Sequence, residues 1–149
     1  VMAIEPEANP LADWLESKRR FLALPDDVLV LPAHNTPFHG LHARLRYLIA
    51  HHEDHLAALE EACVTPSVAL ELLPVIFRRK LDVEQTGLAL GECIAHLNFL
   101  LQSGRVRREL DGDGLYRYIT VDPSVAARAG KIAHQRDDDP VMVYEGEPI

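Results

Sequence analysis

A helix followed by a β-hairpin is predicted by residues 84–121, EQTGLALGECIAHLNFLLQSGRVRRELDGDGLYRYITV. In the first half, apolar residues recur every three or four positions, as on one face of a helix, and Gly104 is a typical residue just past a helix end. Two strand-like runs, 105–110 and 115–121, then flank the glycine-rich turn at residues 111–114. Two such runs around a turn of this composition indicate a hairpin.

Three further helices are expected upstream of this stretch. A long helix is predicted from Gly40 to near Cys63, because leucines and His52 recur there at helical spacing. Thr65-Pro66 and Pro74 predict two short helices, about 66–72 and 74–80, since proline is tolerated in a first turn but breaks a helix interior. Helices followed by a hairpin are the order of a winged-helix domain. We therefore predict a mainly α fold with a small β-hairpin, in which residues 41–130 form a linker helix plus a winged-helix-like domain.

The first 40 residues have a different pattern. A helix is predicted to begin at Asn9-Pro10, where asparagine can cap the first turn and proline fits the first helical position. Val28-Leu29-Val30-Leu31 follows as a continuous apolar run, which is typical of a fully buried strand. One helix and one strand cannot form a core, so residues 1–40 are expected to be the last piece of a larger layered structure. They should leave Trp14 and the strand exposed unless another chain covers them.

Composition narrows the class of protein. The chain of 149 residues has 48% hydrophobic and 26% charged residues, which is ordinary for a globular domain. It contains neither an apolar run of about 20 residues nor a signal-peptide pattern, so we expect a cytoplasmic protein without membrane partners, unless a longer precursor carries a signal. Cys63 and Cys93 lie in apolar helical contexts and are expected to be buried thiols. Residues 131–149 include an acidic run and are expected to form a polar tail.

The loop Leu31-Pro32-Ala33-His34-Asn35-Thr36-Pro37 resembles the closing loop of the metallo-β-lactamase superfamily. The family pattern there is leucine, proline, a small residue, histidine and glycine, with a proline two residues later. Asn35 replaces the glycine, and asparagine is the next residue most able to adopt a positive φ. The resemblance implies that His34 is a metal ligand in the full-length parent. It also implies that residues 1–40 are the remnant of an αββα hydrolase domain, followed by the linker helix and winged-helix appendage that some members carry.

What the resemblance implies about activity depends on residues outside this chain. The principal metal motif of the family, His-x-His-x-Asp-His, does not occur here, and a catalytic zinc needs about three protein ligands. The chain is therefore interpreted as a C-terminal fragment of a metal-dependent hydrolase of esters, thioesters or lactones, and as non-catalytic by itself. The parent would bind zinc or another divalent metal, whereas no cofactor is expected in the isolated chain. The expected partners are the missing N-terminal hydrolase domain, a small-molecule substrate of the parent and a second copy of the chain; catalytic residues remain unknown.

A pair of histidines on the long helix offers a second candidate metal site. His51 and His55 are four residues apart and so face the same side of the helix, a spacing that can chelate zinc. However, no cysteine or third histidine stands at a suitable spacing in the sequence. We therefore expect a solvated or interface helix face rather than a metal site.

The alternative function is a stand-alone winged-helix module that binds a protein partner or nucleic acid. In that case residues 1–40 should pack onto the helical domain. The net charge of −8 disfavours nucleic acid, and residues 81–104, the expected recognition helix, contain no Lys or Arg for phosphates and bases. The candidate phosphate-binding residues would lie on the hairpin instead: Arg105, Arg107, Arg108 and Arg117.

Overall fold

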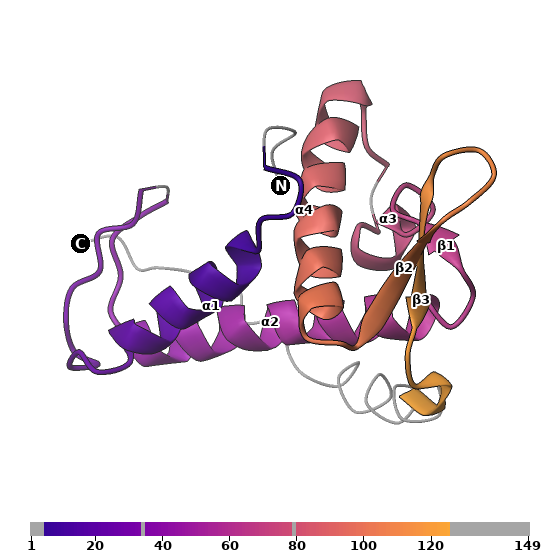
Figure 1. The fold of residues 1–149 in the computed structure, drawn as a ribbon. Helices are drawn as coiled ribbons and strands as arrows, with labels where there is room; N and C mark the ends of the chain where they lie inside the picture. Colours follow the sequence, from indigo (N-terminus) through magenta and orange to yellow (C-terminus); the bar gives the residue numbers. More distant parts are fainter. Residues whose placement is uncertain (1–4, 34, 79, 126–149) are drawn as a thin grey trace.

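A computed structural model describes residues 5–33, 35–78 and 80–125. Helix α2 spans the molecule; α1 lies along its N-terminal half, while α3, α4 and a small sheet gather at its C-terminal half (Figure 1). The elements in chain order are α1 Pro10–Phe21, α2 Leu41–Ala62, β1 Ser67–Val68, α3 Leu73–Ile76, α4 Val83–Gln102, β2 Val106–Leu110, β3 Tyr116–Thr120 and a 3-10 turn at Pro123–Val125.

One hydrophobic core is shared by all four helices and the sheet. Leu59 of α2 and Leu97 and Leu100 of α4 are fully buried, and Leu11 and Leu15 of α1 belong to the same cluster. Trp14 is half-buried against this cluster rather than exposed, so the expectation that it would lie open is wrong. The physical reason is that α1 already finds an apolar face to cover on α2 and α4.

The helix starts follow the predicted capping residues. The Asn9 side chain accepts a hydrogen bond from the Ala12 backbone N–H at 3.2 Å, and Pro10 occupies the first turn of α1. At α4, the Asp82 carboxylate accepts from the Gln85 N–H at 2.8 Å, and the Gln85 side chain accepts from the Asp82 N–H at 3.5 Å. This is a reciprocal capping box. The predicted helices at Asn9-Pro10, Gly40 and Glu84 are thus confirmed to within two residues.

The segment before α1 is held against α4 by side chains of that helix. The Asn98 amide donates to the carbonyl oxygens of Pro6 and Ala8 at 2.8 and 2.9 Å. The Gln102 amide donates to the Glu7 carbonyl at 2.9 Å. Asn98 is 1% exposed, so these two bonds provide partners for its buried amide nitrogen. These contacts place the entry of α1 on α4.

The predicted hairpin is confirmed, and a third strand extends it. Strands β2 and β3 pair antiparallel from Val106↔Thr120 to Leu110↔Tyr116, and β1 pairs with the other edge of β3, so the strand order is β1-β3-β2. The expected helix over 66–72 is therefore wrong. The free edge of β3 offers unpaired backbone groups, and an extended segment after Pro66 satisfies them better than an isolated short helix would. The helix expected over 74–80 shrinks to the single turn α3.

Residues 28–31 do not form the expected buried strand. Their only backbone pairing among the described residues is one bridge, in which Val30 and Phe38 exchange hydrogen bonds of 2.8 and 3.1 Å. Leu29 is 48% exposed and Leu31 is 74% exposed. A buried strand needs neighbouring strands and a covering layer, and neither is supplied by the described parts of this chain. Asn35 adopts the positive φ of 70° expected at the glycine position, while His34 itself lies outside the described residues.

Three remaining expectations concern the C-terminal tail, membrane-spanning helices and the two cysteines. The polar tail expected at 131–149 lies outside the described residues. Among the helices of the described segments, none combines the length and the apolar character that a membrane crossing requires. Cys63 and Cys93 are buried free thiols, as predicted.

The two thiols should be almost inert in the folded protein. Burial, followed by the charge of neighbouring groups, raises the pKa of Cys63 and of Cys93 to about 12. At pH 8 the reactive thiolate is then roughly 1,000-fold rarer than in an unfolded chain. We expect no iodoacetamide adduct within an hour on the native protein and two adducts in 6 M guanidinium, counted by mass spectrometry. Rapid double labelling of the native protein would contradict this packing.

Candidate functional site

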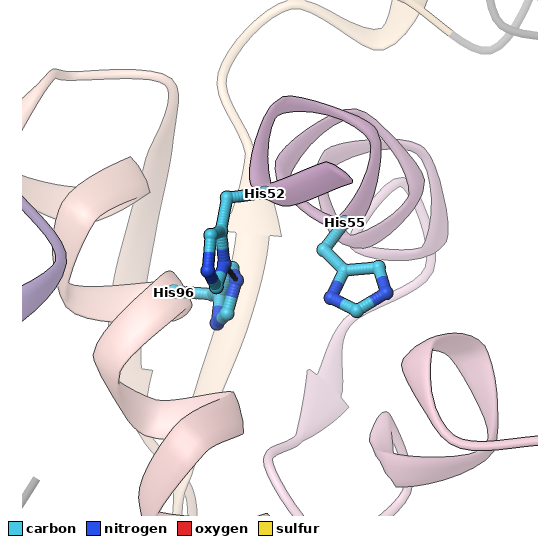
Figure 2. A group of neighbouring side chains, drawn as sticks. All are labelled: His52, His55 and His96. Atoms are coloured by element: carbon cyan, nitrogen blue, oxygen red, sulfur yellow. Dashed lines mark hydrogen bonds between the residues drawn. The ribbon is translucent and has the colours of Figure 1, made fainter. Parts of the chain in front are cut away.

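Three histidines from two helices meet at the crossing of α2 and α4. His52 and His55 project from α2 and His96 projects from α4 toward them (Figure 2). One nitrogen from each ring can be chosen so that all three lie within 4.8 Å of one another, the only such group found in the described residues. The His52 Nδ1 and His96 Nε2 atoms are 3.0 Å apart, although the two residues are separated by 44 positions in the sequence.

Helix geometry explains why these rings meet. His52 and His55 are three residues apart, so they lie on the same face of α2. That face carries Leu56 and Leu59, which are buried against α4. His96 occupies the buried face of α4, between Cys93 and Leu100, and is only 1% exposed. The same packing that forms the core therefore brings the imidazoles together.

The hydrogen bonds of His96 define its tautomer. Its Nδ1 lies 2.8 Å from the backbone oxygen of Glu92, and since a carbonyl oxygen only accepts, Nδ1 carries the proton. In the neutral ring Nε2 then has a free lone pair, which accepts from His52 Nδ1–H. His96 thus presents an acceptor nitrogen to the centre of the cluster.

His55 contributes an unsatisfied nitrogen. Its Nδ1 is buried and has no hydrogen-bond partner among the described residues, while its ring centroid lies 5.5 Å from that of His96. A buried polar atom without a partner costs about 1–3 kcal/mol. A ligand bound between the three rings would remove this cost.

The cluster favours neutral imidazoles. Burial, and then the neighbouring histidines, lower the pKa of His52 and of His55 to about 4 from 6.5. Burial also lowers the pKa of His96. The edge-on contact of Trp14 with His52, 4.7 Å between ring centroids, adds to the apolar surroundings. These shifts favour the neutral form of all three rings at pH 7, and each neutral ring has one nitrogen with a lone pair.

His51 and His55 do face the same side of α2, since their ring centroids are 4.2 Å apart. His51 is exposed and also stacks on Tyr47 at 6.3 Å, and the group of three nitrogens is formed by His55 with His52 and His96. The expectation that a third histidine is missing is wrong, because His96 supplies it. One feature of the sequence could have indicated this cluster: His52 and His96 each occupy the apolar stripe of a different predicted helix.

The four arginines of the hairpin region are each paired with a carboxylate. Arg105 bonds the largely buried Glu60 and Arg108 bonds Glu7, at 2.5 and 2.9 Å. These pairs cancel much of the positive charge that the hairpin would offer to phosphates. The other two pairs are Arg107 with Glu109, and Arg117 with Asp111 and Glu71.

An open apolar groove lies at the other end of α2. Its cavity volume is about 830 Å³, and it lies between the end of α1, the 28–38 segment and the first half of α2. Phe21 and Leu31 contribute apolar side chains, and Lys18 and Arg44 stand among the lining residues. Ala33 and Asn35, the sequence neighbours of His34, also line it. The loop predicted to carry the metal ligand therefore faces an apolar surface that the described chain leaves open.

The histidine cluster should make the metal-free protein sensitive to mild acid. A folded pKa of about 4 for His52 and His55, below 6.5, means that the unfolded state takes up protons first. The contribution of these two histidines to the free energy of unfolding is therefore fully present above pH 6.5 and is lost as the pH falls towards 4. Because both rings are partly exposed, the loss should be on the order of 1–2 kcal/mol for each, after allowance for screening.

The measurement is urea unfolding at pH 7.5, 6 and 5 with a chelator present. The double variant His52→Gln/His55→Gln should lose less stability across this range than the parent chain does. Equal losses in the two proteins would show that other groups cause the acid sensitivity.

Comparison with known proteins identifies the family. A model of the metallo-β-lactamase-like C-terminal domain matches residues 56–121. The structure resembles a β-lactamase domain protein from Burkholderia ambifaria, with 45% identity and a TM-score of 0.79 over 81% of this chain and 36% of that chain. It also resembles a metallo-β-lactamase family protein from Thermus thermophilus, with 33% identity and a TM-score of 0.62 over 75% of this chain and 34% of that chain. No curated protein sequence matches.

The matched region is short relative to these proteins, since this chain spans about a third of the length of either solved structure. The two structural matches cover 81% and 75% of this chain, which is well beyond the residues 56–121 matched by the domain model. The family model and both structures agree with the loop resemblance in the sequence. The chain belongs to the metallo-β-lactamase superfamily and corresponds to the C-terminal part of its members.

Proposed function

We propose that this chain is the C-terminal part of a metal-dependent hydrolase, in which residues 1–40 complete the hydrolase domain and the remainder forms a module beside the substrate cleft. The observation that carries the proposal is the open apolar groove, whose walls include both sequence neighbours of His34. A loop that presents a metal ligand needs a surrounding domain to supply the other ligands. The groove is the surface on which such a domain would pack.

The exposed side chains around the groove support this role. Phe21, Leu24, Leu29 and Leu31 are 46, 45, 48 and 74% exposed, and all of them line the groove. Soluble monomers rarely leave a large contiguous apolar patch open to water unless it is an interaction site. A hydrolase domain that precedes these residues would cover them, and the two related structures are about three times as long as the matched part.

The metal chemistry belongs to the proposed parent. His34 would be one ligand, and the turn after it has the positive φ of Asn35 that the family loop requires. The other ligands would come from residues outside this chain. A zinc or similar ion lowers the pKa of a bound water to about 7, which supplies hydroxide for attack on an acyl carbon. We propose an ester, a thioester or a lactone as the substrate class.

The module at 41–125 supports a winged-helix interpretation. Helix, strand, two helices and a hairpin follow one another, and β1 pairs with the hairpin strand β3. In this arrangement α4 takes the place of the recognition helix, but it has neither lysine nor arginine. A role beside the cleft or at a protein contact therefore fits the module better than DNA binding.

The alternative of a stand-alone module that binds nucleic acid has two supporting observations, the packing of α1 on α2 and α4 and the group of four arginines on the hairpin. Their ion pairs argue against it, because binding phosphate would first require each arginine to leave its carboxylate. A test is the binding of duplex and single-stranded DNA at 50 mM salt. Affinity that falls steeply with salt would favour this alternative over a purely hydrolytic role.

The hydrolase proposal predicts that His34→Ala impairs the protein encoded by the complete source gene. Loss of a metal ligand should lower kcat/KM by at least about 100-fold on whichever ester, thioester or lactone is turned over, and should reduce bound metal. His39→Ala is the matched control, since His39 is an exposed histidine five positions along the chain. A gene without an upstream His-x-His-x-Asp-His segment, or full activity in the His34 variant, would contradict the proposal.

The open groove predicts self-association of the isolated chain. We expect a mass above 16.7 kDa by light scattering at about 100 µM, because a second copy can cover the apolar surface. Leu31→Asp should shift the chain toward the monomer. Leu88→Asp is the matched control, since Leu88 is 79% exposed on α4 and does not line the groove. A chain that stays monomeric throughout would show that the groove does not drive association.

A further inference from the structure

We propose that His52, His55 and His96 bind one divalent transition-metal ion of the zinc class, at a site separate from the metal centre of the proposed hydrolase. The three residues lie on α2 and α4, and none of them belongs to the loop that contains His34. The site is complete within this chain. The inference therefore stands independently of the proposed hydrolase activity.

The donor geometry is close to that of a bound ion. Tetrahedral coordination with zinc–nitrogen bonds of about 2.0–2.1 Å places neighbouring ligand nitrogens about 3.3 Å apart. The His52 Nδ1 and His96 Nε2 atoms are already 3.0 Å apart. The chosen donors of the three rings lie within 4.8 Å, so side-chain rotations of His52 and His55 can close the remaining difference.

His96 has the support that metal-bound histidines usually have. Such a ring commonly donates its second N–H to a backbone carbonyl or a carboxylate, which fixes the tautomer and aims the free nitrogen at the metal. The bond from His96 Nδ1 to the Glu92 carbonyl, 2.8 Å long, is of this kind. Because His96 is 1% exposed, core packing also holds the ring in place.

His55 provides an independent observation. Its buried Nδ1 has no partner among the described residues. An ion in the cluster that binds this nitrogen directly would provide the partner that it lacks. His52 would exchange its hydrogen bond to His96 for a bond to the ion. Coordination therefore replaces one hydrogen bond by three metal bonds.

The donor set selects the class of ion. Imidazole nitrogen suits zinc, cobalt, nickel and copper, whereas magnesium and calcium require oxygen ligands. The group contains three imidazoles and no carboxylate, which excludes a magnesium-type site. Three protein ligands leave a fourth position for water, and His52 and His55 are both partly exposed.

A bound ion would join two helices that are distant in sequence. It would link the middle of α2 to the middle of α4, and it would bind the folded chain far better than the unfolded one. Binding to the native state raises the unfolding midpoint in proportion to the logarithm of free metal. The ion would thus act as a structural clamp at the crossing of the two helices.

The test uses the untagged 149-residue chain carrying His34→Ala, so that the ligand of the proposed hydrolase cannot contribute. After chelation and dialysis, we expect one zinc ion per chain by elemental analysis and an intense visible absorption of the cobalt form, typical of tetrahedral nitrogen coordination. Zinc at about 100 times its dissociation constant should raise the unfolding midpoint by about 10 °C.

The variants decide whether the three histidines are the ligands. His55→Gln and His52→Gln should each weaken zinc binding at least about 100-fold and abolish the midpoint shift, with an unchanged circular dichroism spectrum showing that they fold. His39→Gln, an exposed histidine away from the cluster, should bind as the parent does. Zinc binding that is equal in all these proteins, or absent from the parent chain at millimolar zinc, would overturn the proposal. Activity of a complete hydrolase plays no part in these measurements.

Discussion

The packing of α2 against α4 holds the other elements of the fold in place. Leu56 and Leu59 on one helix and Leu97 and Leu100 on the other are almost completely buried. Burial of each such side chain contributes about 1.5–3 kcal/mol. The other elements attach to this pair, because α1 packs on both helices and the sheet follows directly from the end of α4.

The sheet is fastened to the same crossing by hydrogen bonds and an ion pair. The Thr120 N–H donates to the Cys63 carbonyl at 2.9 Å, and the Thr120 hydroxyl donates to the Glu60 carbonyl. Arg105, just before β2, bonds the Glu60 carboxylate. The last turn of α2 therefore anchors both strands of the hairpin, and Arg105 is occupied by this structural contact.

The two halves of α2 serve different purposes. Its C-terminal half is enclosed by α3, α4 and the sheet, whereas its N-terminal half borders the open groove with α1 and the 28–38 segment. The enclosed half carries Leu56 and Leu59, the α2 residues of the main hydrophobic core. The open half accounts for a chain that corresponds to the C-terminal part of a larger metallo-β-lactamase superfamily protein. The histidine cluster lies between these two regions, where the ring of His52 contacts Trp14 of α1.

Elements whose signals are local could be predicted from the sequence. Asn9-Pro10 specified the start of α1, helical spacing specified α2 and α4, and the turn at 111–114 specified the hairpin, because capping, periodicity and turn chemistry involve neighbouring residues. The loop around His34 is a weak signal alone, and it was the order of this loop, the long helix and the helix–hairpin module that indicated the family. Tertiary packing determines that residues 67–68 join the sheet, that Leu29 and Leu31 stay exposed, and that His96 meets His52 and His55. Each of these depends on which distant surface is available for pairing or burial, and that information is spread over segments far apart in the chain.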